Sequence, residues 1–90
     1  MPNISQTMLR RFGIAVYMYY RDFGQHHAPH IHVMYQNEQA VFGIPGGELL
    51  EGSLPGRMLR KVRAWIELYD EELQERWEHA VRGEPITRID

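Results

Sequence analysis

Hydrophobic and polar positions alternate with a period of two through the first half of the chain, which is typical of strands that bury one face. The segment Phe12–Tyr20, rich in β-branched and aromatic residues, predicts a first strand. The alternation also predicts a second strand over His30–Tyr35, a third over Gln39–Ile44 and a short fourth over Glu48–Glu51. The third strand is expected to turn Ala40, Phe42 and Ile44 inward. In the first strand one face carries Phe12, Ile14, Val16, Met18 and Tyr20, and the other carries Tyr17, Tyr19 and Arg21.

Turn-forming residues separate these strands. The segment Arg21–Pro29 contains Asp22 and Gly24 and predicts a long hairpin loop. Gln36–Glu38 predicts a tight turn, and Pro45–Gly47 suits a type II turn. The first half of the chain therefore predicts a small antiparallel sheet of three to four strands.

After Gly52 the apolar positions recur with the period of a helix. Ser53 is the predicted cap, and Pro55 fits the first turn because its missing amide donor is harmless there. A single helix over Leu54–Arg82 would be roughly 43 Å long, whereas a domain of 90 residues has a radius of gyration of about 12 Å. We therefore expect two helices with a break near Leu68–Asp70. Their shared apolar stripe comprises Met58, Leu59, Val62, Trp65, Ile66, Tyr69, Leu73, Trp77 and Ala80.

The length and the order of these elements predict one α+β domain over residues 1–90, with the sheet first and two C-terminal helices after it. Gly83 and Pro85 end the helical pattern. The tail Glu84–Asp90 is expected either to add an edge strand or to lie free.

Composition and charge exclude several classes of function. The chain has no cysteine, which excludes disulfides, zinc–thiolate sites and cysteine nucleophiles. Its net charge of −2 at pH 7 argues against a protein that coats duplex DNA. Arg10, Arg11 and the apolar run after them imitate a signal peptide, but Arg21 and Asp22 follow where small residues would mark cleavage. We expect a cytoplasmic protein without a membrane partner.

Four of the five histidines lie within His26–His32. Because side chains alternate along a strand, His30 and His32 are expected to point the same way, with their Cβ atoms about 6.5 to 7 Å apart. Imidazole both accepts and donates protons near neutral pH. The pair therefore predicts a catalytic site in which both rings enter one hollow open to solvent and act as general base and general acid.

Two other interpretations of the histidines stay open. A zinc site needs three or four ligands, and His27, His30 and His32 are the leading candidates. His26, Asp22 or a carboxylate such as Glu48 could complete the set. Alternatively, the histidines pack beside tyrosines or lie in a solvated loop and do no chemistry. The leading interpretation, proton transfer, requires no metal and no cofactor.

The register of the sheet decides which aromatic residues lie beside the histidines. Either Tyr17 and Tyr19 or Met18 and Tyr20 share their face, and the sequence leaves both arrangements open. The candidate substrate-binding residues, an aromatic ring and two guanidinium groups that could stabilise phosphate charge, are Tyr19, Arg21 and Arg57.

The first predicted helix is basic and the second is acidic. A solvated face with intrahelical ion pairs, such as Arg63 with Glu67, explains this pattern. Contact with single-stranded RNA or with a charged protein is the alternative. The basic residues of the first helix are Arg57, Arg60, Lys61 and Arg63.

Several short motifs are spread along nearly the whole chain. They are Met1-Pro2-x-Ile4-Ser5, Phe12-Gly13-Ile14, Met18-Tyr19-Tyr20-Arg21-Asp22, Pro29-His30-x-His32-Val33, Gly52-x-Leu54-Pro55, Trp65 and Trp77. This combination resembles the small bacterial family called domain of unknown function 4160. The resemblance implies a neighbouring gene for a small protein of domain of unknown function 2442, in an arrangement like a toxin–antitoxin pair.

We therefore expect a toxin-like protein that acts on RNA as a metal-independent endoribonuclease, with His30 and His32 as the proton-transferring residues. Its expected partners are RNA and a small antitoxin-like protein encoded nearby. A non-catalytic protein-interaction module and a histidine metal-binding protein are the alternatives, and a homodimer is also open.

Overall fold

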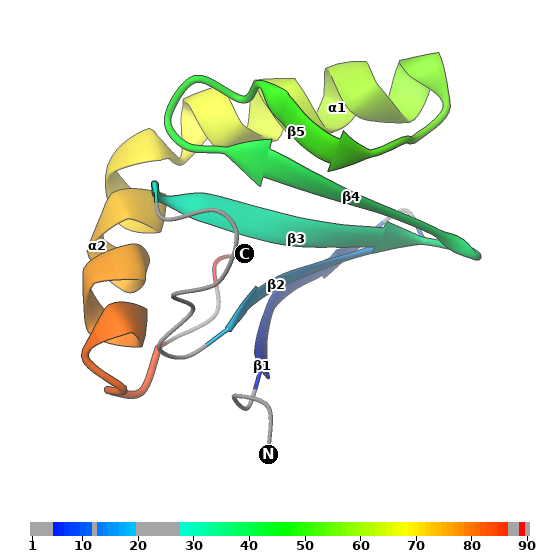
Figure 1. Cartoon of the computed structure of the whole chain (residues 1–90). Helices are drawn as coiled ribbons and strands as arrows, with labels where there is room; N and C mark the ends of the chain where they lie inside the picture. The colour runs from blue at the N-terminus through cyan, green and yellow to red at the C-terminus, as the bar shows by residue number, and fades with distance from the viewer. Residues whose placement is uncertain (1–4, 12, 20–27, 87–88, 90) are drawn as a thin grey trace.

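The computed structural model describes residues 5–11, 13–19, 28–86 and 89, which form a five-stranded sheet with two helices on one face (Figure 1). Each strand pairs antiparallel with the next one along the chain. The predicted α+β class, with an antiparallel sheet followed by two helices, is confirmed. The elements are β1 Ser5–Arg11, β2 Ile14–Tyr19, β3 His30–Tyr35, β4 Glu38–Gly43, β5 Leu49–Gly52, α1 Gly56–Leu68 and α2 Asp70–Val81.

The sheet contains the four predicted strands and one more. β1 pairs with β2 from Ser5 opposite Tyr19 to Arg11 opposite Ile14. The turn between the two strands contains Gly13 in the left-handed conformation, with a φ of +76°. Polar residues dominate β1, so hydrophobic alternation gave no signal for it.

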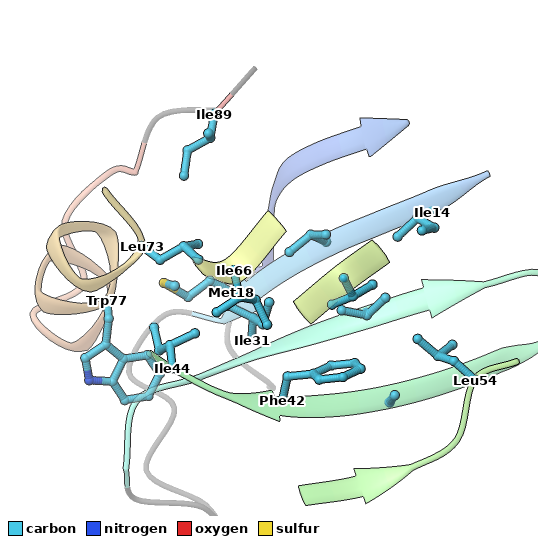
Figure 2. Packing of buried hydrophobic residues seen from close by; sticks show 14 of the residues in the cluster. Ile14, Met18, Ile31, Phe42, Ile44, Leu54, Ile66, Leu73, Trp77 and Ile89 are labelled. Carbon is cyan, nitrogen blue, oxygen red and sulfur yellow. The ribbon is translucent and has the colours of Figure 1, made fainter. Parts of the chain in front are cut away.

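The core lies between the inner face of the sheet and the helices (Figure 2). Alternate residues of each central strand enter it, and Met18, Ile31 and Phe42 have no exposed surface. The three inward positions predicted for the third strand are all buried. In the first predicted strand the face with Ile14, Val16 and Met18 is the buried one, whereas Phe12 and Tyr20 lie outside the described residues. The helices contribute Met58, Val62, Ile66, Leu73, Trp77 and Ala80.

The break between the helices is where the sequence predicts it. α1 ends at Leu68 and α2 begins at Asp70, and Leu68 is 72% exposed because it lies off the apolar stripe. The predicted cap is wrong: the N-cap position of α1 is Pro55. The amide of Ser53 instead donates to the carbonyl of Gln39, 3.2 Å away, which continues the β4–β5 pairing.

The described residues of the C-terminal tail take neither of the two predicted forms. Gly83, with a φ of +75°, turns the chain back after α2, and the Glu84 amide donates to the carbonyl of His79. Ile86 and Ile89 are then buried in the core. The described residues of the tail, 84–86 and 89, therefore pack on the domain, and none of them belongs to a strand.

Neither helix of the described residues is long and apolar enough to cross a membrane.

Candidate functional site

A row of side chains crosses the outer face of the sheet, opposite the helices. Tyr17 of β2 pairs with His32 of β3, His32 pairs with Val41 of β4, and Val41 pairs with Glu51 of β5. Residues directly opposite one another in an antiparallel pair share a face. The register thus places Tyr17 beside His32, while Met18 enters the core on the other face.

His30 begins β3, at the end of the sheet next to α2 (Figure 1). Its side chain is only 1% exposed, and its ring centroid lies 4.9 Å from that of Trp77 in α2. Its Nδ1 atom lies 2.7 Å from the carbonyl oxygen of Ala28. Because a carbonyl can only accept, Nδ1 carries the proton, and Nε2 is the acceptor nitrogen of the neutral ring.

The two strand histidines lie side by side, as predicted. Their ring centroids are 5.2 Å apart with an interplanar angle of 67°, so one ring presents its edge to the other. They do not share a solvent-open hollow, because His30 is buried while His32 is partly exposed. The cause is tertiary: the Trp77 ring from a distant helix packs against His30.

His32 forms part of the wall of an open hollow of about 430 Å³ on the outer face. Glu51 and Gln39 line the same hollow, so an imidazole, a carboxylate and a primary amide border one space. An imidazole and a carboxylate can serve as proton donor and acceptor for one bound ligand, and an amide can hold it by hydrogen bonds. The other lining residues are Ala40, Val41 and Gly52.

Glu51 is the site residue that the sequence did not single out. It lies on the short edge strand β5, where the pairing with β4 is irregular between Val41 and Phe42. One residue of register shift moves a side chain to the other face, so strand alternation alone could not assign Glu51 to the side of His32. Glu48, the carboxylate considered for a metal site, packs against Gly43 and Gly46 and does not line the hollow.

Of the other predicted site residues, Arg57 does not line this hollow, and the side chains of the rest lie outside the described residues. Arg57 is exposed in the first turn of α1, and α1 packs on the inner face of the sheet. The backbone of Tyr19 pairs with Ser5, but its side chain lies outside the described part of the chain, as do Arg21 and His27. Within the described ranges, no three His, Asp or Glu side chains are placed to hold a metal ion.

Comparison with known proteins gives a family but no activity. No curated protein and no solved structure matches the chain. The family described as Domain of unknown function (DUF4160) matches residues 13–78, which includes the sheet from β2 to β5, both strand histidines and most of the two helices. The chain therefore belongs to the domain of unknown function 4160 family.

Proposed function

We propose that this protein is an endoribonuclease that cleaves RNA by acid–base chemistry in the hollow on the outer face of the sheet. The observation that carries the proposal is the placement of His32 and Glu51 around one open space. Val41 lies between them in the row, so the two side chains come from strands that are separated by one strand. A phosphodiester group between an imidazole and a carboxylate has both a proton donor and a proton acceptor within reach.

The proposed reaction needs one base and one acid. Glu51 takes the proton of the ribose 2′-hydroxyl as its oxygen attacks the adjacent phosphorus, and protonated His32 donates a proton to the departing 5′-oxygen. The P–O5′ bond breaks, and the products are a 2′,3′-cyclic phosphate and a free 5′-hydroxyl. No metal is required for these transfers, and Gln39 supplies a hydrogen-bonding group that can hold the substrate.

His30 has a different role in this proposal. It is buried, and its own orientation is fixed by donation to Ala28. It therefore acts as a positioning residue that holds the His32 ring through their edge contact, while His32 touches the substrate. In the same proposal, the Arg21 guanidinium neutralises the negative charge of the phosphate.

The test is cleavage of a fluorescently labelled single-stranded RNA by the purified protein, with and without EDTA. We expect cleavage to persist in EDTA and to fall by about 10²- to 10⁴-fold in His32→Gln and in Glu51→Gln. His79→Gln is the matched control, because His79 lies on α2 and does not line the hollow, and it should cleave at the rate of the parent protein. Absence of cleavage by the parent protein, or equal rates in His32→Gln and the parent, would overturn the proposal.

We also propose that this activity makes the protein the toxin of a toxin–antitoxin-like pair. Expression from a tightly repressed promoter should arrest growth, and co-expression of the small neighbouring protein should restore it. His32→Gln should be harmless in the same cells while accumulating to the same level. Growth arrest by His32→Gln at parent strength would separate toxicity from the proposed chemistry.

A second candidate function is a non-catalytic protein-interaction module. The observation that favours it is that Tyr17 and Met34 are partly exposed on the outer face of the sheet, beside the buried Ala15 and Val41. Native mass spectrometry of the co-expressed pair would show a complex that survives His32→Gln but is lost in Met34→Glu. Such a complex, together with an inactive parent protein in the RNA assay, would favour this function over catalysis.

A further inference from the structure

A second pocket, separate from the histidine hollow, is lined by residues of α1 and of the turn that joins β4 to β5. Its volume is about 500 Å³. Two guanidinium groups, one carboxylate and a glycine-containing turn border it. The lining residues are Pro45, Gly46, Arg60, Arg63, Ala64 and Glu67.

Arg63 is built into the wall of this pocket. Its Nε atom donates to the carbonyl oxygen of Gly47 at 2.9 Å. Gly47 has a φ of +77°, and a Cβ atom there would lie only 3.3 Å from Cγ of Arg63, so the turn packs closely on the arginine. The predicted ion pair between Arg63 and Glu67 is not among the ion pairs of the described residues. The Nε bond orients the guanidinium and leaves its two Nη groups for a ligand.

Arg60 adds a second guanidinium one helical turn earlier. It is exposed, and it has no ion pair or hydrogen bond with the described part of the chain. Gly46 lines the pocket as well, and no hydrogen bond of its amide occurs within the described residues. Two guanidinium groups therefore border one space, and Glu67 is the one carboxylate among its lining residues.

We propose that this pocket binds a phosphate group in its singly charged, diester form. Guanidinium donors match the oxygens of a phosphate in pairs, and Arg is the residue that proteins use for such recognition. The lining charges, two arginines against Glu67, sum to +1 and match one phosphodiester better than a doubly charged anion. The Glu48 carboxylate packs against Gly46 and is not one of the lining residues.

The phosphate could come from an RNA backbone or from a small phosphorylated molecule, and the same pocket would recognise both. The site does not depend on the proposed cleavage reaction, because it shares no lining residue with the histidine hollow. Loss of catalysis in His32→Gln therefore leaves this inference intact.

The experiment is an NMR titration of the ¹⁵N-labelled protein with three probes: inorganic phosphate, dimethyl phosphate and a 2′-O-methyl octauridylate that cannot be cleaved at its 2′-oxygen. We expect the amides of Gly46 and Gly47 and the Nε–H of Arg63 to shift with dimethyl phosphate. Arg60→Gln and Arg63→Gln should each weaken binding by about tenfold, since each removes charge-assisted hydrogen bonds.

The Glu67→Gln variant is expected to change the affinity in the opposite direction from the arginine variants. Removal of the one lining carboxylate should strengthen phosphate binding by about two- to fivefold, whereas a general loss of structure would weaken it. Lys61→Gln is the matched control, because it removes a charge from the same helix at a position that does not line the pocket. Its affinity should stay within about twofold of that of the parent protein.

The three probes distinguish an RNA backbone from a small phosphorylated molecule as the source of the phosphate. Tighter binding of the oligonucleotide than of dimethyl phosphate, with the same arginine dependence, supports an RNA backbone as the ligand. Arginine-dependent binding of the two small phosphates alone supports a small phosphorylated molecule. Failure of all three probes to shift these signals, or shifts that persist in Arg60→Gln and Arg63→Gln, would overturn the proposal.

Discussion

The Nδ1 atom of His79 lies 2.7 Å from the Oε1 atom of Glu84, so an imidazole in the last turn of α2 is tied to the segment that follows the helix. The same carboxylate accepts from Arg82, through Nε at 3.1 Å and Nη2 at 3.2 Å. These two donors lower the pKa of Glu84 from its ordinary value of 4.5, with the Arg82 hydrogen bond as the larger cause. The Arg82 pKa is raised by the same contact.

The sign of the pH effect follows from the lowered pKa of Glu84. A carboxyl whose pKa is lower in the folded state stabilises the fold fully above the unfolded value and loses that contribution as pH falls through the folded value. Glu84→Gln should therefore denature at lower urea concentration than the parent at pH 7, and the difference should shrink below about pH 4. Urea unfolding curves at pH 7 and pH 3 test this; an equal difference at both values would contradict it.

The Gly52 position should tolerate no side chain. Its φ is +80°, and a Cβ atom there would lie 2.1 Å from the carbonyl oxygen of Gln39. Gly52→Ala should therefore lower the free energy of unfolding by about 2 kcal/mol or more. Gly56→Ala is the control, because Gly56 is helical and a Cβ atom there meets only Nη1 of Arg60 at 3.7 Å.

We expect Gly56→Ala to be neutral or to stabilise the protein by about 0.5 to 1 kcal/mol, as alanine favours the helix. Thermal unfolding of the two variants in parallel gives both values. A Gly52→Ala variant as stable as Gly56→Ala would show that β4 and β5 separate at this point without cost.

The tautomer of His30 is a direct consequence of its bond to Ala28. At a pH where the ring is neutral, the proton should reside on Nδ1, because the acceptor is a main-chain carbonyl. Long-range ¹H–¹⁵N spectra of the folded protein distinguish the two ring nitrogens. The same spectra in concentrated urea serve as the control, since the bond is absent there. A protonated Nε2 with a bare Nδ1 in the folded protein would contradict the geometry.

Ile66 and Leu68, two apolar residues near the helix break, should differ sharply in their contribution to the free energy of unfolding. Ile66 is completely buried, so Ile66→Ala should cost about 2 to 5 kcal/mol through lost burial and the cavity left behind. Leu68 is 72% exposed, and Leu68→Ala should change stability by less than about 0.5 kcal/mol. Chemical denaturation checks both values, and a large loss in Leu68→Ala would indicate a partner surface that covers this residue in solution.

The sequence by itself determined which segments form the central strands, which residues share a face of each strand, and where the helical region divides. These features are local, because a period of two or of 3.6 follows from backbone geometry alone. The break at Leu68–Asp70 also follows from length, since an unbroken helix would extend beyond a domain of this size. The sequence did not predict β1, because this strand has no alternating apolar pattern and is recognised by its pairing with β2.

Only the tertiary structure decided which side chains share a site. The sequence placed His30 and His32 on one face, but the packing of Trp77 buries one of them and leaves the other at the hollow. Glu51 and Arg63 gained their places through the irregular pairing of β5 and the close turn at Gly47. Contacts between residues distant in the chain depend on register, crossing and packing, and no local period encodes them.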